Sequence, residues 1–306
     1  MKAKILTQLS QGTAAISGEH LSRVLGVSRV AVWKHIRQFQ ELGYAIEATS
    51  KGYRLLSSPD TPFPWVFGDR ASRVHYYQEI SSTMDLAMEL ARNGCPGFTT
   101  VVAERQTKGR GRLQRAWQSM LGGLYFTMVL RPQIPLALAP LINLAAAVDL
   151  ATTIEALYGI QTQLKWPNDV QVEGQKLAGI LSQMAAETDR IEFVNVGIGI
   201  NVHNDTRHVQ PPAVSISQIT DRKASRADIL AGFWDRFEQR LGPGNFTEVV
   251  AQWKARAVTL GRQVKVQTLY DLFEGRAVDI EENGGLILER SDGQRMTVVY
   301  GDCFHQ

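Results

Sequence analysis

Residues 103–117 read AERQTKGRGRLQRAW, and in their middle the run GRGR at 109–112 alternates glycine with arginine. Such a run cannot pack in a hydrophobic core, because each buried and unpaired charge would be costly. Arginine binds phosphate or carboxylate oxygens through two parallel N–H groups, and glycine lets the backbone approach a ligand closely. We expect a solvated, mobile loop that an anion orders into a lid over a nucleotide or an acyl phosphate. Trp117 is either a core anchor or a surface on which an adenine stacks.

A second cluster of charged and turn-forming residues lies downstream. Residues 164–170 read LKWPNDV, and residues 174–181 read GQKLAGIL. Lys165 lies in a strand-like segment, directly before a turn. A lysine at a strand end beside the arginine-rich lid is expected to meet the same anion as the arginines. Residues 194–201, VNVGIGIN, predict a buried strand with glycines at positions where side chains would obstruct close neighbours. This stretch lacks the glycine fingerprints of dinucleotide-binding and P-loop proteins.

A hydroxyl-rich stretch precedes the lid. Residues 80–85 read ISSTMD and lead into a helix-like run. The hydroxyl groups either cap that helix or bind a small polar group at a strand-to-helix junction. From Val74 to about Leu260 the chain alternates strand-like and helix-like segments, as a layered α/β or α+β domain does.

The excess positive charge lies in the first 60 residues, which carry eight basic and four acidic side chains, whereas the remaining 246 carry 25 and 26. A basic segment favours a polyanion, because each neutralised phosphate releases counterions. Residues 16–25 and 29–39 predict two helices joined by a tight turn, with Ser17 and Ser28 as N-caps. The second helix has a polar, basic face, the arrangement that lies in a DNA major groove. That face consists of Arg29, Trp33, Lys34, Arg37 and Gln38.

A hairpin is predicted after these helices. Residues 44–48 and 53–56 alternate like two strands, and residues 49–52 are turn-forming. The result is a winged helix whose tip, with Lys51, reaches phosphate or the minor groove. A helical protein-interaction module with the same hydrophobic pattern is the alternative. Prolines at 59, 62 and 64 mark a short linker, since proline continues neither helix nor ladder.

The C-terminal segment and the overall composition complete the picture. Residues 262–302 alternate in short bursts, which predicts four or five antiparallel strands in a small barrel. The 306-residue chain has two cysteines, no histidine with metal-ligand spacing and no run of 18–20 uninterrupted apolar residues. No signal-peptide core follows the N-terminus. We expect a soluble, cytoplasmic protein with no membrane partner and no metal-ligand set, in which Asp169 either assists Mg²⁺ or caps a turn.

The order of these motifs resembles the biotin protein ligase family, specifically its bifunctional members, which join the ligase to a DNA-binding domain that represses biotin genes. The resemblance implies a multidomain α+β fold. It consists of a winged helix-turn-helix at 1–60, a class II synthetase-like mixed α/β ligase domain at 66–257, and an SH3-like β-barrel at 258–306. Biotin and ATP would form biotinyl-5′-adenylate, and a lysine of a biotin carboxyl carrier protein would then take the biotin and release AMP.

The resemblance also implies residue roles. Catalysis is expected from Lys165, Arg110 and Arg112. Biotin contacts are expected from Ser82, Thr83, Gln106, Arg110, Gly111, Arg112 and Lys165. Contacts with ATP or the adenylate are expected from Gly109, Arg110, Arg112, Arg115, Trp117, Lys165, Asn168, Lys176 and Asn201. DNA contacts are expected from Ser28, Arg29, Trp33, Lys34, Arg37 and Lys51, and Mg²⁺ should accompany ATP to neutralise pyrophosphate.

The chain departs from the family at three positions. Met84 stands where asparagine is usual, which bears on biotin affinity. Gln114 replaces a usual glycine, and Ala116 replaces a commonly basic residue, so the lid should be stiffer and less positive. Two other functions stay open: a lipoate or octanoate protein ligase, and a repressor that senses biotin with weak or no ligase activity. Expected partners are the carrier protein, operator DNA and a second copy in a ligand-promoted homodimer.

Overall fold

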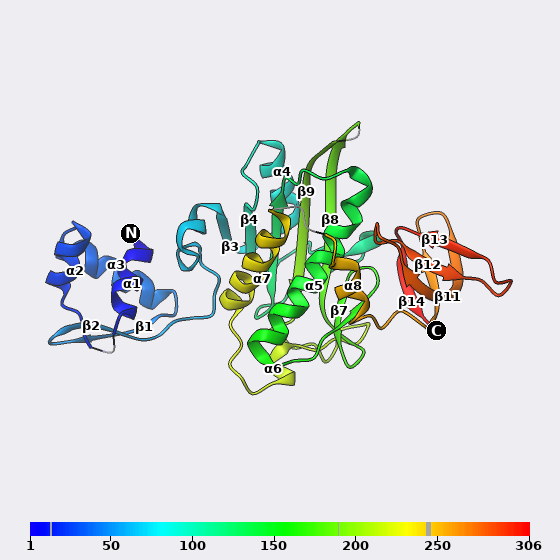
Figure 1. Ribbon diagram of the computed structural model, residues 1–306. Helices are drawn as coiled ribbons and strands as arrows, with labels where there is room; N and C mark the ends of the chain where they lie inside the picture. The colour runs from blue at the N-terminus through cyan, green and yellow to red at the C-terminus, as the bar shows by residue number, and fades with distance from the viewer. Residues whose placement is uncertain (13, 189, 243–245) are drawn as a thin grey trace. The chain divides into compact units, whose positions relative to one another are not determined.

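The computed structural model describes residues 1–12, 14–188, 190–242 and 246–306, with Gln114 described by its backbone alone. The chain divides into two compact units, Met1–Ser72 and Arg73–Gln306. Figure 1 labels most of the helices and strands of both units.

The first unit is a winged helix-turn-helix. Its elements are α1 (Lys2–Ser10), α2 (Gly18–Leu25), α3 (Arg29–Glu41), β1 (Ala45–Thr49) and β2 (Gly52–Ser57), and the two strands pair antiparallel. The predicted caps are confirmed: Ser17 Oγ accepts the His20 N–H at 3.1 Å, and Ser28 Oγ accepts the Ala31 N–H at 3.2 Å.

The core of this unit and its linker are built from aromatic and aliphatic side chains. Buried residues of the three helices are Ile5, Leu9, Leu21, Val32, Ile36 and Phe39. The proline-rich linker folds back on them through the short 3₁₀ segment η1 (Pro64–Val66), followed by η2 (Gly68–Arg73). Trp65 stacks on Phe63 with ring centroids 4.6 Å apart and donates to the Tyr44 hydroxyl at 2.9 Å. The linker is therefore held against its own unit.

A seven-stranded sheet organises the second unit, in the order β3-β4-β5-β9-β8-β7-β6. Its strands are β3 (Val74–Ile80), β4 (Thr100–Gln106), β5 (Leu124–Leu130), β6 (Gln163–Lys165), β7 (Asp169–Val172), β8 (Gln175–Glu187) and β9 (Arg190–Ile200). The β3–β4 pair is parallel and every other neighbouring pair is antiparallel.

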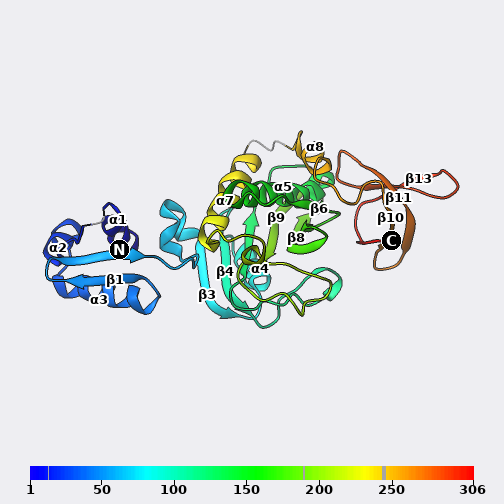
Figure 2. The same cartoon turned by 90° about the horizontal axis from the view of Figure 1, so that it is seen from below.

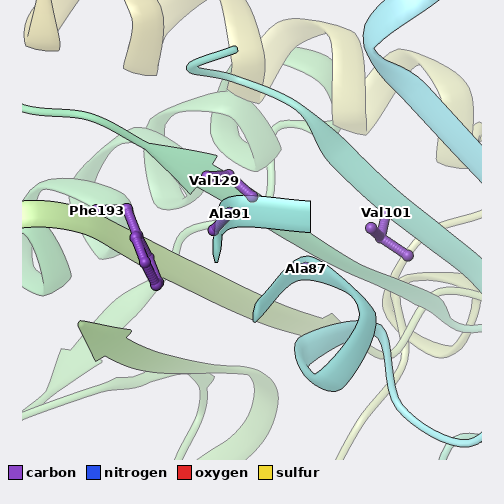
Figure 3. Close-up of a cluster of buried hydrophobic side chains, with 5 residues drawn as sticks. All are labelled: Ala87, Ala91, Val101, Val129 and Phe193. Carbon is purple, nitrogen blue, oxygen red and sulfur yellow. The ribbon is translucent and has the colours of Figure 1, made fainter. Parts of the chain in front are cut away.

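Helices cover both faces of this sheet (Figure 2). The helices of this unit are α4 (Thr83–Arg92), α5 (Ala139–Tyr158), α6 (Ile216–Ile219), α7 (Arg226–Leu241) and α8 (Val249–Lys254), with 3₁₀ turns η3 (Arg112–Gln114) and η4 (Leu136–Leu138). Ala87 and Ala91 of α4 pack on Val101, Val129 and Phe193 of three adjacent strands (Figure 3). Successive strand residues point to opposite faces, so Phe126 of β5 faces away from Val129 of the same strand. Phe126 meets Phe233 of α7, with ring centroids 5.6 Å apart. The face beside α4 is thus opposite the face beside α7.

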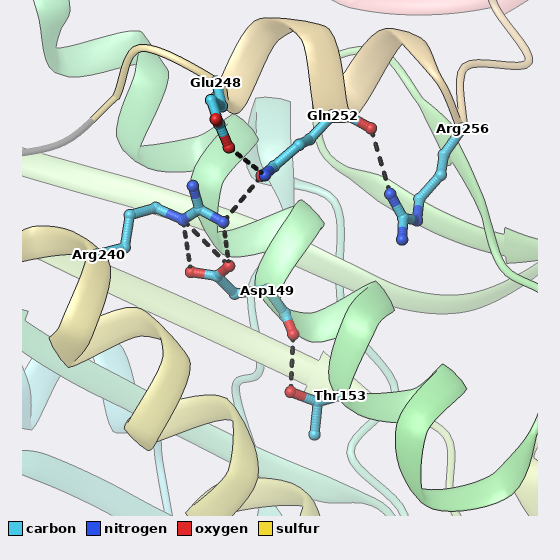
Figure 4. A network of polar contacts seen from close by, with 6 residues as sticks. All are labelled: Asp149, Thr153, Arg240, Glu248, Gln252 and Arg256. Carbon is cyan, nitrogen blue, oxygen red and sulfur yellow. Dashed lines mark hydrogen bonds and ion pairs between the residues drawn. The ribbon is translucent and has the colours of Figure 1, made fainter.

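Helix α5 is the apolar centre of the helical layer that also contains α7 and α8. Among the described residues, Leu136–Tyr158 is the one helical segment long and apolar enough to cross a membrane by composition. The search of the sequence for an uninterrupted apolar run did not detect it. It is mostly buried within the unit, and its Asp149 forms a two-pronged pair with Arg240 of α7, with N–O distances of 2.6 to 3.0 Å (Figure 4). Gln252 of α8 joins this pair by accepting from Arg240 at 3.0 Å. These contacts identify α5 as a core helix.

The C-terminal segment forms a five-stranded antiparallel sheet in the order β13-β12-β11-β10-β14. Its strands are β10 (Gln263–Gln267), β11 (Leu272–Ile280), β12 (Leu286–Glu289), β13 (Arg295–Val298) and β14 (Asp302–His305). Trp166, buried in the turn after β6, joins this sheet to the larger one. Its indole N–H donates to the Gly284 carbonyl at 3.1 Å, and its backbone N–H donates to Thr259 Oγ1 at 2.9 Å. The expected multidomain α+β fold class is confirmed.

Candidate active site and DNA-binding surface

A cavity of about 430 Å³ lies in the second unit, at the N-terminus of α4. It collects nearly all of the expected ligand-contacting residues: Ser82, Thr83, Gln106, Arg110, Gly111, Arg112, Arg115, Trp117, Lys165, Asn168, Lys176 and Asn201. Its described lining carries five cationic side chains and two carboxylates, those of Asp169 and Asp302. The excess of positive charge suits an anionic ligand.

Hydroxyl and amide groups form one end of the cavity. Ser82 caps α4, with Oγ accepting the Asp85 N–H at 3.4 Å. The Gln106 side-chain oxygen accepts from the Thr83 backbone N–H at 2.8 Å and from the Thr83 hydroxyl at 3.0 Å. Gln106 also donates to Ser119 Oγ at 2.8 Å. These bonds fix the positions of the Thr83 and Gln106 polar groups, as recognition of a neutral polar ring requires.

Met84 is part of the same wall. Its side chain is buried, 4% exposed, and a Cβ built on Gly197 would lie 2.8 Å from its methyl carbon. The methionine therefore occupies space above the glycine-bearing strand β9. At this position the cavity has an apolar, flexible side chain in place of an amide.

The arginine loop, which carries Arg110, Arg112 and Arg115, is held by two carboxylates from different elements. Arg110 pairs with Asp85 of α4, and Arg112 and Arg115 pair with Asp302 of β14 at 3.2 and 2.9 Å. Burial lowers the pKa of the Arg112 guanidinium, while the charges of Asp302 and Asp169 oppose that shift. The loop was expected to be solvated unless an anion orders it; Arg110 and Arg115 are 40% and 56% exposed, and all three arginines pair with protein carboxylates.

Trp117 lies flat against two glycines of the sheet. A Cβ on Gly199 would meet its indole at 2.5 Å, and a Cβ on Gly179 at 2.8 Å, so only glycine leaves room for the ring. Lys176 lies over the same ring, with Nζ 5.2 Å from the centroid, and pairs with Asp169 at 2.7 Å. The glycines of strands β8 and β9 thus leave the space that Trp117 occupies. The sequence predicted this role for the glycines of β9 but not for Gly179 of β8.

Lys165 differs from the other four cations of the cavity. Within the described chain, no carboxylate forms an ion pair with it, whereas Arg110, Arg112, Arg115 and Lys176 each have one. Its charge instead acts on two residues of β14. It opposes the burial that raises the pKa of the Cys303 thiol to about 12, and it adds to the burial that lowers the pKa of His305 to about 4.

Three other expected ligand residues have structural bonds in this protein. Asn168 Nδ2 donates to the Ile180 carbonyl at 2.8 Å, and Asn201 Nδ2 donates to the Lys176 carbonyl at 3.2 Å. Both line the cavity, and their direct contact with a ligand stays a prediction. Gly109 is buried beneath the loop and does not line the cavity. Its carbonyl accepts the Trp117 N–H at 2.9 Å.

Three cavity residues come from the C-terminal sheet and were not predicted from the sequence: Asp302, Cys303 and Phe304. They begin a four-residue strand whose burial does not alternate, so no periodicity singled them out. The Arg115 guanidinium lies 5.4 Å from the centre of the Phe304 ring. Among the described residues, no group of three or more His, Cys, Asp or Glu side chains is arranged to hold a metal ion.

The first unit has a hollow between α3 and the wing. Arg29, Val30 and Trp33 line it from the helix, and residues 48–53 line it from the hairpin. Trp33 is 52% exposed, so it lies on the surface of α3. Lys34 and Arg37 are exposed elsewhere on α3, and Ser28 is the cap of that helix. Arg29, Trp33 and Lys51 are thus brought to one hollow, whereas Ser28, Lys34 and Arg37 do not line it.

A helix-turn-helix unit joined to a mixed α/β domain with a cationic cavity defines a DNA-binding protein fused to an enzyme. Three family models agree with this division. The biotin/lipoate A/B protein ligase family matches residues 76–201, a helix-turn-helix domain matches residues 2–54, and the biotin protein ligase C-terminal domain matches residues 259–306.

Relatives of similar length agree as well. The bifunctional ligase/repressor BirA of Bacillus spizizenii is 40% identical over 92% of this chain and 91% of its own length. BirA of Escherichia coli is 28% identical over 94% and 92%. The biotin protein ligase of Aquifex aeolicus, solved with biotin and ATP, has a TM-score of 0.65 and 27% identity, and covers 76% of this chain and 98% of its own. The chain belongs to the biotin protein ligases, in the branch of bifunctional ligase/repressors. The identification made from the sequence is confirmed.

Proposed function

We propose that this protein joins the carboxyl group of biotin to the α-phosphate of ATP, giving biotinyl-5′-adenylate and pyrophosphate. A lysine amine of a biotin carboxyl carrier protein then attacks the mixed anhydride, forming an amide and releasing AMP. The observation that carries the proposal is the charge arrangement of the cavity, in which Lys165 lacks a carboxylate partner in the described chain beside three arginines held by carboxylates.

Lys165 is the group best suited to the adenylyl-transfer step, in which the biotin carboxylate attacks the α-phosphate. Negative charge builds up between the attacking carboxylate and the α-phosphate, and a cation that has no other partner opposes it at no cost of breaking an ion pair. Thr83 and Gln106, already oriented by their mutual hydrogen bonds, supply donors and acceptors for the ureido ring of biotin. The arginine loop retains the adenylate and shields its reactive anhydride from water.

Trp117 and Lys176 form the nucleotide part of the site in this proposal. The indole already lies against the glycines of the sheet and presents an aromatic surface for adenine. Mg²⁺ fits as the companion of ATP, because Asp169 provides a carboxylate in the cavity and Mg²⁺ is commonly held by one or two carboxylates together with phosphates. When bound, Mg²⁺ neutralises the pyrophosphate leaving group.

The winged helix supplies the second half of the function. The exposed basic face of α3 and Lys51 of the wing suit operator DNA, and the adenylate is proposed as corepressor. A homodimer favoured by the adenylate matches a palindromic operator, because ordering a surface loop changes the subunit surface. The cytoplasm, where carrier protein, ATP and DNA meet, is the proposed location.

Pyrophosphate release measured with MgATP and biotin, lipoate or octanoate in separate reactions tests the catalytic proposal. Release with biotin alone, followed by labelling of a purified carrier domain, supports the ligase. Release with lipoate or octanoate would assign the chain to the other branch of its family. DNA binding with biotin but no pyrophosphate release with any acid would leave a sensor without catalysis.

A further inference from the structure

Asp302 lies at the border between the C-terminal sheet and the cavity. It is the first residue of β14, pairs in register with Gln267 of β10, and is 8% exposed. The C-terminal sheet therefore reaches the catalytic cavity with a buried carboxylate. Neither the sequence motifs nor the roles proposed above assign a function to it.

The two arginines contact Asp302 in a way that leaves their hydrogen-bond donors available. Arg112 Nε is 3.2 Å from Oδ1, and an amino nitrogen of Arg115 is 2.9 Å from Oδ2. Oδ2 is buried, and no donor in the described chain meets it with hydrogen-bond geometry. The guanidinium groups are thus held mainly by charge, and their N–H groups stay free for the oxygens of a ligand.

The carboxylate also solves a problem of like charges. Two guanidinium groups brought to the same side of the cavity repel each other, and one buried anion between them makes the approach favourable. The pair formed by Arg110 and Asp85 is different, because its side chains are 40% and 47% exposed and solvent screens it. Asp302, by contrast, has a side chain only 10% exposed, and Arg112 is 19% exposed. The stronger hold on the loop is therefore the one from the C-terminal sheet.

We propose that Asp302 is a positioning residue for adenylate formation, which holds Arg112 and Arg115 over the cavity with their donors directed to the phosphate. The inference rests on the proposed ligase function. It gives the C-terminal sheet a defined chemical task, the orientation of the arginine loop. It also predicts that nucleotide binding and adenylate retention depend on this carboxylate more than biotin binding does.

The test compares Asp302→Asn with Glu282→Gln, which removes an exposed carboxylate from the same sheet domain. Pyrophosphate release gives the KM for MgATP and for biotin separately, and a chase with unlabelled biotin gives the rate at which the preformed adenylate escapes. For Asp302→Asn we expect the KM for MgATP and the escape rate to rise about tenfold each, and the KM for biotin to change less than about twofold. Glu282→Gln should match the natural protein.

A second pair of variants separates positioning from folding. Asp302→Glu keeps the charge and should restore most of the nucleotide affinity, which a merely structural defect would not. Arg115→Gln alters a side chain that is 56% exposed, so the fold should tolerate it, and it must also speed escape of the adenylate. In the Arg112→Gln/Arg115→Gln background, Asp302→Asn should have little further effect, because its partners are gone.

Unchanged or tighter nucleotide binding by Asp302→Asn would overturn the inference, the latter by making Asp302 a competitor of the ligand. Equal losses for MgATP and biotin without rescue by glutamate would also overturn it. If Asp302→Asn does not fold, unchanged escape from Arg115→Gln overturns the inference instead. Failure of the natural protein to release pyrophosphate with biotin would contradict the ligase proposal itself, a result distinct from all of these.

Discussion

At the scale of single residues, the decisive property of Lys165 is the lack of an ion-pair partner in the described chain. We predict that Lys165→Gln lowers the rate of adenylate formation by about 10²- to 10³-fold, the usual effect of removing one electrostatic stabiliser of a transition state. The melting temperature should stay close to that of the natural protein, since no ion pair is broken. Pyrophosphate release and thermal unfolding measure both effects.

Lys223→Gln is the matched control, because it removes an exposed lysine from the same unit. It should leave the rate unchanged. Turnover by Lys165→Gln within a few-fold of the natural rate would remove Lys165 from the catalytic step.

His305 gives the protein a pH dependence of stability. Burial, with the charges of Lys165 and Arg262, lowers its pKa to about 4, whereas a histidine in the unfolded chain titrates near 6.5. Between these values the unfolded chain binds a proton that the folded chain does not, so stability rises with pH. The contribution is complete above pH 6.5 and is lost as the pH falls towards 4. After allowance for solvent screening it amounts to about 1 kcal/mol.

His305→Gln keeps a polar partner for Thr259, whose hydroxyl oxygen lies 3.2 Å from His305 Nε2. We predict that urea unfolding at pH 7 and pH 5 shows a smaller loss of stability for His305→Gln than for the natural protein. An equal loss in both proteins would show that other groups cause the acid sensitivity.

Residues with a strong local signature were predictable from the sequence, and residues defined by tertiary contact were not. Arg110 and Arg112 stand in a charged, glycine-bearing stretch that a core cannot hold, and Lys165 stands directly before a proline-bearing turn. Asp302 stands in an ordinary short strand, and its importance arises only when the chain brings β14 to the arginine loop. Nothing in the spacing of Asp302 encodes that meeting.

At the scale of elements, a buried ion pair joins helices α5 and α7. Asp149 and Arg240 have side chains 4% and 16% exposed. Removal of one partner from such a pair leaves an uncompensated charge and costs about 3–5 kcal/mol, whereas replacement of both by apolar groups costs far less. We predict that Arg240→Met lowers the free energy of unfolding by about this amount, and that Asp149→Leu/Arg240→Met recovers most of the loss.

Urea unfolding of the two single variants and the double variant forms a mutant cycle for this pair. Arg295→Met is the control, since Arg295 pairs with Glu289 on the surface with its side chain 66% exposed, and it should cost less than about 1 kcal/mol. Additive losses in the double variant would show that the two side chains act independently of each other.

Elements with clear periodicity were predicted well. The helix-turn-helix, its serine caps and the hairpin follow from local rules of capping and alternation, and they form as expected. Helix α2 buries Leu21, whereas Val24, three residues further on, is 50% exposed. The order of the seven strands was not predictable, because the pairing of β5 with β9 joins segments far apart in sequence. Alternation gives the face of a strand but not its neighbour.

At the scale of the whole molecule, the uneven distribution of charge agrees with the division into two compact units. The first 60 residues carry the whole excess of positive charge, and they fall within the unit that contains the winged helix. The charge distribution therefore favoured contact of this segment with a polyanion before any fold was known. The domain boundaries 1–60, 66–257 and 258–306 stay predictions. The latter two regions contribute to one site, since the C-terminal sheet contacts the arginine loop.

The two functions should be coupled through the adenylate. We predict that a gel shift of operator DNA needs both biotin and MgATP, and that the affinity falls steeply with salt because basic side chains displace counterions from phosphates.

Lys51→Gln, at the exposed tip of the wing, should weaken binding to all DNA sequences alike and reduce the salt slope by about one for each subunit bound. Lys223→Gln, outside the winged helix, should leave the slope unchanged. Adenylate formation should be the same in all three proteins, because Lys51 lies outside the catalytic unit. A salt slope unaltered by Lys51→Gln would exclude a phosphate contact by the wing. Binding that is equally tight without biotin would separate the DNA-binding function from the chemistry of the cavity.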